Sequence, residues 1–290
     1  AVIRVATEIC TEIADLTTIN SPHSGVYSDT VWVRARLVES DGVTAIPDQL
    51  VHFKIYNGDD PGIVTRDSTA EYTDANGFAR SYIILTQDPD WSDTFYDKNG
   101  DSMHIMAYFE ANDGYAAADT VENFNVRKEV ARFVSIDCPS CDEGLKKIKF
   151  NGKFGSGYIV TNNGTPQNVT ITAYLTEDQD GSFGDLTKAN VRFDLSPSGS
   201  STVNEYWARP TFYDNIDGID VYQATVDATV SAGTYGANCY TVHVSVGDYY
   251  RARANCHSTL TVHNKNASSV FSGGGDILVA SSTGKYAGDE

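Results

Sequence analysis

The chain has 290 residues, of which 41% are hydrophobic and 21% charged, and its formal net charge is −18. This composition is typical of a globular protein and argues against a disordered one. The strong negative charge argues against nucleic acid and anionic membrane surfaces as partners, because both would repel the chain. The sequence also lacks an apolar run of the roughly 20 residues that a membrane-spanning helix needs, so we expect no membrane insertion.

Taken in chain order, alternating apolar and polar residues predict short strands separated by turns, without convincing helical periodicity. The first alternation covers residues 3–9, and a polar connection follows it. Further strands are predicted at 30–38, 50–56, 78–86, 104–110, 115–126, 130–136, 157–161, 168–175, 190–195 and 221–230, with a closing hairpin at 239–263. Long loops are predicted at 87–101, 177–185 and 196–212. Regularly spaced short strands with turn signals predict an all-β fold built from β-sandwiches.

The sequence also contains an internal repeat. Val51–Ile55 recurs as Val191–Leu195, and Tyr72–Gly77 recurs as Tyr213–Gly218. The copies begin 140 and 141 residues apart and keep the same order, and each half closes in a long alternating hairpin. Two tandem copies of one β-rich module explain this better than chance. A short charged hinge at 127–129 separates the two copies.

Several of these segments resemble a known family. Val31–Leu37, Ile46–Phe53 and Tyr72–Ala79 look like a prokaryotic immunoglobulin-like module of the invasin/intimin type, and Glu177–Phe193 is similar to the Ig-like repeats of large exported proteins. The resemblance covers about residues 26–265. It implies two tandem immunoglobulin-like β-sandwiches in an extracellular surface protein. Such modules serve as stalks, adhesins and enzyme appendages alike, so the resemblance bears on fold more than on function. The domains that we expect are 1–127, 128–265 and a Gly/Ser-rich tail at 266–290.

The chain has five cysteines. Cys239 and Cys256 are predicted to lie opposite each other in a hairpin with a Gly-Asp turn, at a non-hydrogen-bonded position where a cross-strand disulfide fits. Cys138 and Cys141 form a C-x-x-C motif that lacks the helical context of thioredoxin chemistry and a second ligand pair for zinc, so a local disulfide is the simpler interpretation. Cys10 is left over, either as a free thiol or as a bridge to another chain.

Two acidic loops offer oxygen ligands of the kind that calcium prefers. Neither loop has the spacing of an EF-hand, and a solvated acidic loop is the alternative interpretation for each. The candidate ligands are Glu177, Asp178, Asp180 and Asp185 in one loop, and Asp88, Asp90, Asp93, Asp97 and Asp101 in the other. The sequence indicates no other cofactor.

Three features favour an extracellular or cell-surface location. Asn163, Asn168 and Asn266 begin N-x-S/T sequons, which makes them candidate glycosylation sites. Ala1 fits a mature N-terminus left by signal peptidase. The resemblance to invasin/intimin-type modules implies an extracellular surface protein.

The sequence offers no nucleophile elbow and selects no pair of catalytic carboxylates, so we predict no enzymatic activity. Tandem modules, strand-like terminal segments and an odd cysteine favour an extracellular structural protein that assembles with itself into a filament or surface layer. The terminal segments would link one subunit to the next by adding a strand to a neighbour's sheet. Their apolar residues are Ile3, Val5, Ile9, Ile277, Leu278 and Val279.

The alternative function is that of an adhesin or carbohydrate-binding fragment of a larger surface protein, with glycans as partners. Aromatic side chains in the predicted loops would then form the binding face. These side chains are Trp91, Tyr96, Trp207 and Tyr213.

Overall fold

The structure is a computed structural model that describes residues 9–19, 23–57, 65–85, 103–112, 114–137, 139–140, 147–161, 165–178, 180–232, 236–254 and 256–265. It confirms the predicted all-β fold, since the described segments form strands apart from turns and one short 3-10 helix, η2 (Leu186–Lys188). Within these residues, no helix has the length and hydropathy that crossing a bilayer would require.

The first half of the chain forms two sheets. One sheet has the strand order β1-β3-β6, and the other has the order β2-β8-β7-β4-β5. The strands are β1 (Thr11–Thr18), β2 (Ser24–Val26), β3 (Thr30–Glu39), β4 (Leu50–Asn57), β5 (Thr65–Tyr72), β6 (Phe78–Ile84), β7 (Met103–Phe109) and β8 (Ala118–Arg127). We call this half module 1.

The second half, module 2, also forms two sheets. One has the order β11-β10-β13-β17-β16 and is extended by β9 and β19, and the other has the order β12-β20-β18-β14-β15. The strands are β9 (Glu129–Phe133), β10 (Ile148–Phe150), β11 (Lys153–Phe154), β12 (Gly157–Thr161), β13 (Gln167–Glu177), β14 (Asn190–Pro197), β15 (Asn204–Ala208), β16 (Thr211–Ile216), β17 (Ile219–Val230), β18 (Ala237–Gly247), β19 (Tyr250–Ala252) and β20 (Cys256–Asn264).

The strand orders of the two modules correspond, as the internal repeat predicts. Sheet β2-β8-β7-β4-β5 matches β12-β20-β18-β14-β15 strand for strand, and its first pair is parallel in both modules. The repeated sequences Val51–Ile55 and Val191–Leu195 lie in the equivalent strands β4 and β14. Alternation explains why these segments become strands, because Val191, Phe193 and Leu195 are fully buried while the residues between them are only partly covered.

A glycine in each of the equivalent strands β2 and β12 allows the strand to approach the core closely. Gly25 in β2 pairs with Val126, and Gly157 in β12 pairs with Leu260. A Cβ atom added at Gly25 would lie 2.5 Å from Leu85 Cδ1, and one added at Gly157 would lie 2.5 Å from Leu260 Cδ1. The parallel pairing in each module therefore depends on a residue without a side chain.

Module 2 contains a tyrosine that ties two neighbouring strands together. The hydroxyl of Tyr240, on β18, donates to the carbonyl oxygen of Ser231 at 3.1 Å and accepts from the Ser231 backbone N–H at 3.1 Å. Tyr240 is 5% exposed. A buried tyrosine that bonds back to the backbone a few residues upstream resembles the tyrosine corner of immunoglobulin sandwiches.

Three sequence-based expectations about strands need correction. The segment expected as a polar connection after residue 9 forms β1, where Ile13, Leu16 and Thr18 are buried. The predicted loop at 196–212 contains β15 and the start of β16. The closing hairpin does not run straight through its turn, because β19 leaves β18 and pairs in parallel with β9 instead.

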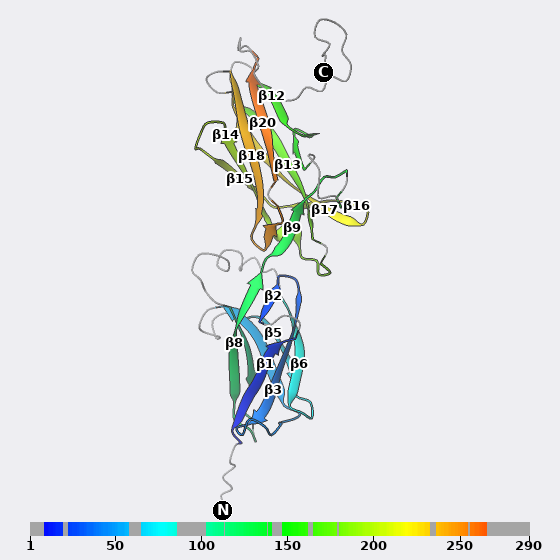
Figure 1. The fold of residues 1–290 in the computed structure, drawn as a ribbon, viewed down its shortest axis with the longest axis vertical. Coiled ribbons are helices and arrows are strands. Elements are labelled where there is room, and N and C mark those ends of the chain that lie inside the picture. The colour runs from blue at the N-terminus through cyan, green and yellow to red at the C-terminus, as the bar shows by residue number, and fades with distance from the viewer. Residues whose placement is uncertain are drawn as a thin grey trace, which may run out of the picture.

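The two modules are stacked end to end along the long axis of the molecule (Figure 1). Module 1 forms one end and module 2 the other, so the first described strand starts far from where β20 ends. Only Lys128 separates β8 from β9. One continuous cluster of buried apolar side chains includes residues of both modules, among them Tyr27 of module 1 and Tyr249 of module 2.

Candidate functional site: the junction between the modules

The junction is built from two buried tyrosines that face each other across the module boundary. Tyr27 follows β2 and is 1% exposed, and Tyr249 precedes β19 and is 2% exposed. Their ring centroids lie 5.0 Å apart with the planes at 83°, an edge-to-face pair. Such a pair adds about 0.5–1.5 kcal/mol beyond the burial of its area, so it favours one fixed arrangement of the modules.

The backbone around Lys128 is held on both sides. The N–H of Tyr27 donates to the carbonyl oxygen of Arg127 at 3.1 Å, which fixes the end of β8. The N–H of Glu129 donates to the carbonyl oxygen of Tyr249 at 2.9 Å, which fixes the start of β9. The chain therefore passes from one module to the next through a single residue with hydrogen-bonded neighbours.

Glu129 is the unusual ionisable group of the junction. It is 1% exposed, and its Oε1 atom is buried without a hydrogen-bond partner among the described residues. Burial, and after it the nearby carboxylates of Asp180, Glu177 and Asp29, raise the pKa of Glu129 to about 8. A carboxyl group in this environment is mostly protonated at neutral pH.

A cavity of about 350 Å³ opens beside Glu129. Both modules line it, since β2 and β8 contribute from one side and β9 and β19 from the other. Its charged lining residues are Arg127, Lys128, Glu129, Asp180 and Arg251. The junction thus combines an apolar contact between tyrosines with a mixed-charge space.

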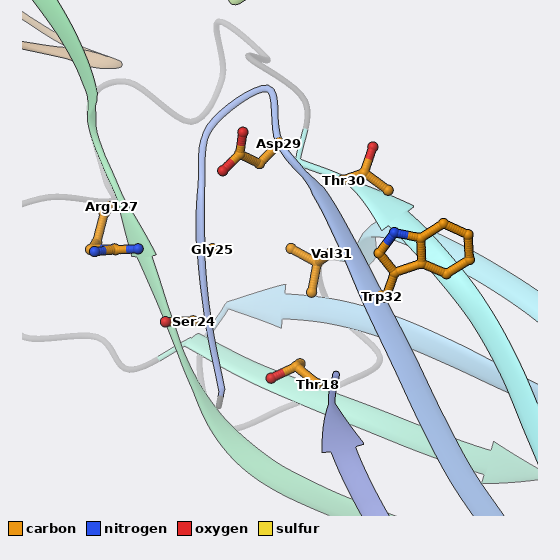
Figure 2. A pocket seen from close by; sticks show the side chains of 8 residues that line it. All are labelled: Thr18, Ser24, Gly25, Asp29, Thr30, Val31, Trp32 and Arg127. Carbon is orange, nitrogen blue, oxygen red and sulfur yellow. The ribbon is translucent and has the colours of Figure 1, made fainter. Parts of the chain in front are cut away.

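A smaller hollow of about 90 Å³ lies on the module 1 side of the same strand end (Figure 2). Figure 2 shows Arg127 and Asp29 on either side of the segment that carries Gly25, with the Trp32 side chain directed away from it. Trp32 is 44% exposed and pairs with Tyr82 across strands β3 and β6, with ring centroids 5.4 Å apart.

The predicted Cys239–Cys256 disulfide is wrong in this structure, because the predicted hairpin register is wrong. Cys239 lies opposite Thr261, while Cys256 lies opposite Val244, and both thiols are free. The prediction placed Tyr250–Ala252 in the second arm of the hairpin, opposite β18. In the structure these residues form β19 and pair with β9. Burial raises the pKa of the Cys256 thiol to about 11, so it is a poor nucleophile.

Of the other three cysteines, Cys10 alone lies within the described residues. Cys10 is exposed and its thiol is free. Its backbone carbonyl oxygen accepts a hydrogen bond of 2.9 Å from the Ser40 N–H. Cys138 and Cys141 lie outside the described residues.

The four acids of the 177–185 loop have separate partners. Glu177 accepts from the Tyr250 hydroxyl and the Gly184 N–H, each at 2.8 Å. Asp178 pairs with Arg132 at 3.0 Å, Asp180 accepts from the Ser182 N–H, and Asp185 caps η2. Within the described residues, no three acidic, histidine or cysteine side chains are placed to hold a metal ion. The second candidate calcium loop, with Asp88, Asp90, Asp93, Asp97 and Asp101, lies outside the described part of the chain.

Other predicted site residues are distributed over the molecule. Asn168 lies exposed on β13, where its Oδ1 accepts from Thr229 at 3.0 Å. Ile9 bridges in parallel to Tyr115 of its own module and is 39% exposed. Trp207 and Tyr213 are exposed on β15 and β16. The described residues do not include Ile3, Val5, Trp91, Tyr96, Asn163, Asn266, Ile277, Leu278 or Val279.

Sequence reasoning missed the residues that make the junction. Glu129 was expected in a short charged hinge, and the structure shows that it is buried. Tyr27 and Tyr249 stand in turns, where a tyrosine is usually half-exposed. The one available signal was that strand pattern resumes at Val130 directly after the hinge, which leaves no room for a flexible linker.

Comparisons with known proteins give no family assignment. No family model matches the chain. No curated protein matches it either.

Solved structures show distant similarity. The adhesin InvE of Yersinia pseudotuberculosis is 10% identical, with a TM-score of 0.36 over 86% of this chain and 58% of that one. Dimeric latent PorU of Porphyromonas gingivalis is 12% identical, with a TM-score of 0.30 over 88% of this chain and 24% of that one. Trypsin-activated α2-macroglobulin of Escherichia coli is 11% identical, with a TM-score of 0.28 over 87% of this chain and 18% of that one. The chain thus spans less than two thirds of each, and similarity at this level carries no inference about function.

Proposed function

We propose that this protein is a non-catalytic structural subunit of an extracellular filament or surface assembly, in which it acts as a stiff rod. The observation that carries the proposal is the path of the chain. The described chain begins at one end of an elongated molecule and reaches the other end through a one-residue connection (Figure 1). The buried Tyr27–Tyr249 contact supports a fixed alignment of the two modules.

A parallel ladder on the last strand of each module suits a load-bearing role. In module 1, the early strand β2 is parallel to the last strand β8, and in module 2, β12 is parallel to the last strand β20. When two parallel strands are pulled from opposite ends, they must slide past each other, and the hydrogen bonds of the ladder share the load. Each module therefore contains a parallel ladder that would resist tension on its last strand.

Self-association through the terminal segments would turn such rods into a polymer. A subunit that offers one surface at one end and a different surface at the other makes heterologous contacts, which propagate into filaments unless a rotation closes them into a ring. The segments with Ile3, Val5 and Ile9 at one terminus and Ile277, Leu278 and Val279 at the other have the apolar residues for strand addition.

Electron microscopy of the concentrated, unreduced protein tests the proposal. We expect ordered polymers with an axial repeat close to the length of one molecule. The variant Ile277→Asp with Val279→Asp should remain monomeric, and Ser281→Asp with Ser282→Asp is the matched control for added charge in the tail. A wild-type protein that stays monomeric at high concentration would contradict the proposal.

Exposed aromatic residues on module 2 favour a second function, that of a glycan-binding adhesin. Trp207 is 51% exposed and Arg192 stacks over its ring at 5.5 Å, while Phe212 is 55% and Tyr213 is 38% exposed. Sugar rings stack on such surfaces through their apolar faces. Binding on a glycan array that Trp207→Ala abolishes, while Tyr158→Ala on the distant strand β12 leaves it intact, would establish this function.

A further inference from the structure

Module 2 has a pocket that neither the rod function nor the glycan-binding alternative uses. It encloses about 270 Å³ between the loop at 180–185 and the β16–β17 hairpin, with β13 and β17 behind it. Figure 1 shows β16 and β17 at the side of module 2, away from the stacking axis. The pocket therefore lies off the axis along which molecules of the proposed polymer would join end to end.

The lining combines carboxylates with aromatic rings and contains no basic side chain among the described residues. Glu177 is 7% exposed, and both of its hydrogen bonds, from Tyr250 and Gly184, end on Oε1. Asp220 accepts from Asn215 through Oδ1 at 2.6 Å. The protein thus holds one oxygen of each carboxylate by hydrogen bonds, and both residues line the pocket.

Aromatic side chains complete the wall. Phe183, at the rim of the pocket, is 68% exposed, which is unusual for a phenylalanine. Tyr222 lines the inside, and Phe212 packs against it edge to face with ring centroids 5.8 Å apart. The negative faces of aromatic rings attract cations, as carboxylates do.

Charge and size together select the class of ligand. Burial raises the pKa of Glu177, and Asp180 and Asp185 act in the same direction. Asp220 lines the pocket as well, so the site repels an anion and offers a neutral molecule no charge partner. The volume is slightly below the roughly 300–1,000 Å³ of pockets for drug-sized molecules. We propose that this pocket binds an ammonium or guanidinium group on an alkyl stem, such as a lysine or arginine side chain of a partner protein or a small free amine.

An NMR titration of the full-length chain tests the proposal. The probes are Nα-acetyl-lysine amide, Nα-acetyl-arginine amide and the neutral isostere Nα-acetyl-norleucine amide. We expect the two cationic probes to shift the amide signals of Gly184 and Gly218, both in the pocket lining, with saturation at millimolar concentration and weakening in high salt. The norleucine probe should leave these signals in place.

Variants separate the pocket from general electrostatics. Phe183→Ala and Asp220→Asn should each weaken binding of the lysine probe about tenfold, in the range expected for one desolvated cation–π or charged contact. Asp227→Asn removes the same charge from an exposed position on the same strand and should leave binding unchanged. Both pocket positions are exposed, so the variants should fold, and their thermal unfolding curves check this.

The source of the cation is resolved by comparing n-pentylamine with the peptide acetyl-Gly-Lys-Gly-amide. Equal affinity identifies a site for small alkyl amines, and tighter binding of the peptide identifies a site for a protein-borne lysine. Equal shifts by the lysine and norleucine probes, or equal weakening by Asp220→Asn and Asp227→Asn, would overturn the proposal. The outcome is independent of the microscopy result, because this titration does not require polymer formation.

Discussion

At the scale of single residues, the molecule depends on positions where the side chain is unusual for its surroundings. Gly25 and Gly157 lie in the equivalent strands β2 and β12, where each packs against a leucine side chain of its own module. Glu129 lies in the charged segment that connects the two modules, and its carboxyl group is nevertheless buried. In each case the physical constraint comes from a neighbouring element rather than from adjacent residues.

Gly25→Ala and Gly157→Ala should each destabilise their module by about 1–3 kcal/mol, the usual cost of overpacking a core. The added methyl group would meet leucine side chains at 2.5 Å in both places. Denaturant unfolding of each variant checks the expected loss. Gly114→Ala is a suitable control, because its nearest atom would lie 3.9 Å away and stability should change little.

Glu129 should make stability depend on pH in the direction opposite to that of an ordinary salt-bridged acid. Its folded pKa of about 8 lies above the ordinary value of 4.5, so the protonated form favours folding. The contribution is complete below about pH 4.5, declines as pH rises, and is lost above about pH 8. At about 1.4 kcal/mol for each pKa unit, the loss is at most roughly 5 kcal/mol.

Thermal unfolding between pH 5 and pH 9 measures this dependence. Glu129→Gln keeps the shape without the ionisation and should flatten the decline. Glu122→Gln, an exposed change on β8, should keep the wild-type profile. A decline of the same size in the Glu129→Gln variant would mean that another group titrates in this range, and Glu177, whose pKa burial also raises, would be tested next.

At the scale of elements, hydrogen bonds outside the ladders hold strands in their places. The Tyr240 hydroxyl makes two such bonds with the backbone of Ser231. Tyr240→Phe leaves these buried backbone groups without their partner and should destabilise module 2 by about 1–3 kcal/mol. Calorimetry with Tyr72→Phe as control, an exposed tyrosine of module 1, checks the value and the module in which it appears.

The strand β19 shows how one element can change the pairing around it. Only three residues long, it pairs with β9 and brings Tyr249 to the junction, so β18 and β20 meet in a different register from a simple hairpin. Alternation along 239–263 could not indicate this, because alternation reports which residues share a face but not which strand lies alongside. The error in the cysteine pairing follows directly from it.

At the scale of the whole molecule, the end-to-end arrangement predicts a directional response to force. When the two chain ends are pulled, tension on the last strands β8 and β20 loads their parallel ladders with β2 and β12 in shear. Handles at Gly42, which precedes β4, and at Asn112, which follows β7, would instead peel the antiparallel β4–β7 ladder apart bond by bond. Single-molecule force spectroscopy should give an unfolding force severalfold higher for the end-to-end geometry, since forced unfolding follows the unfolding barrier. Equal forces would remove the mechanical argument for a rod.

The sequence alone determined the all-β class, the tandem repeat and the positions of most strands, including β3, β4, β7, β12 and β17. These follow from local information, because the two-residue period of a strand is visible in the residues themselves. Tertiary structure decided the burial of Glu129, the contact between Tyr27 and Tyr249, the register of the cysteines and the pocket around Glu177 and Asp220. Each of these depends on which distant segments become neighbours, and a one-residue difference in pairing moves a side chain to the other face of its sheet.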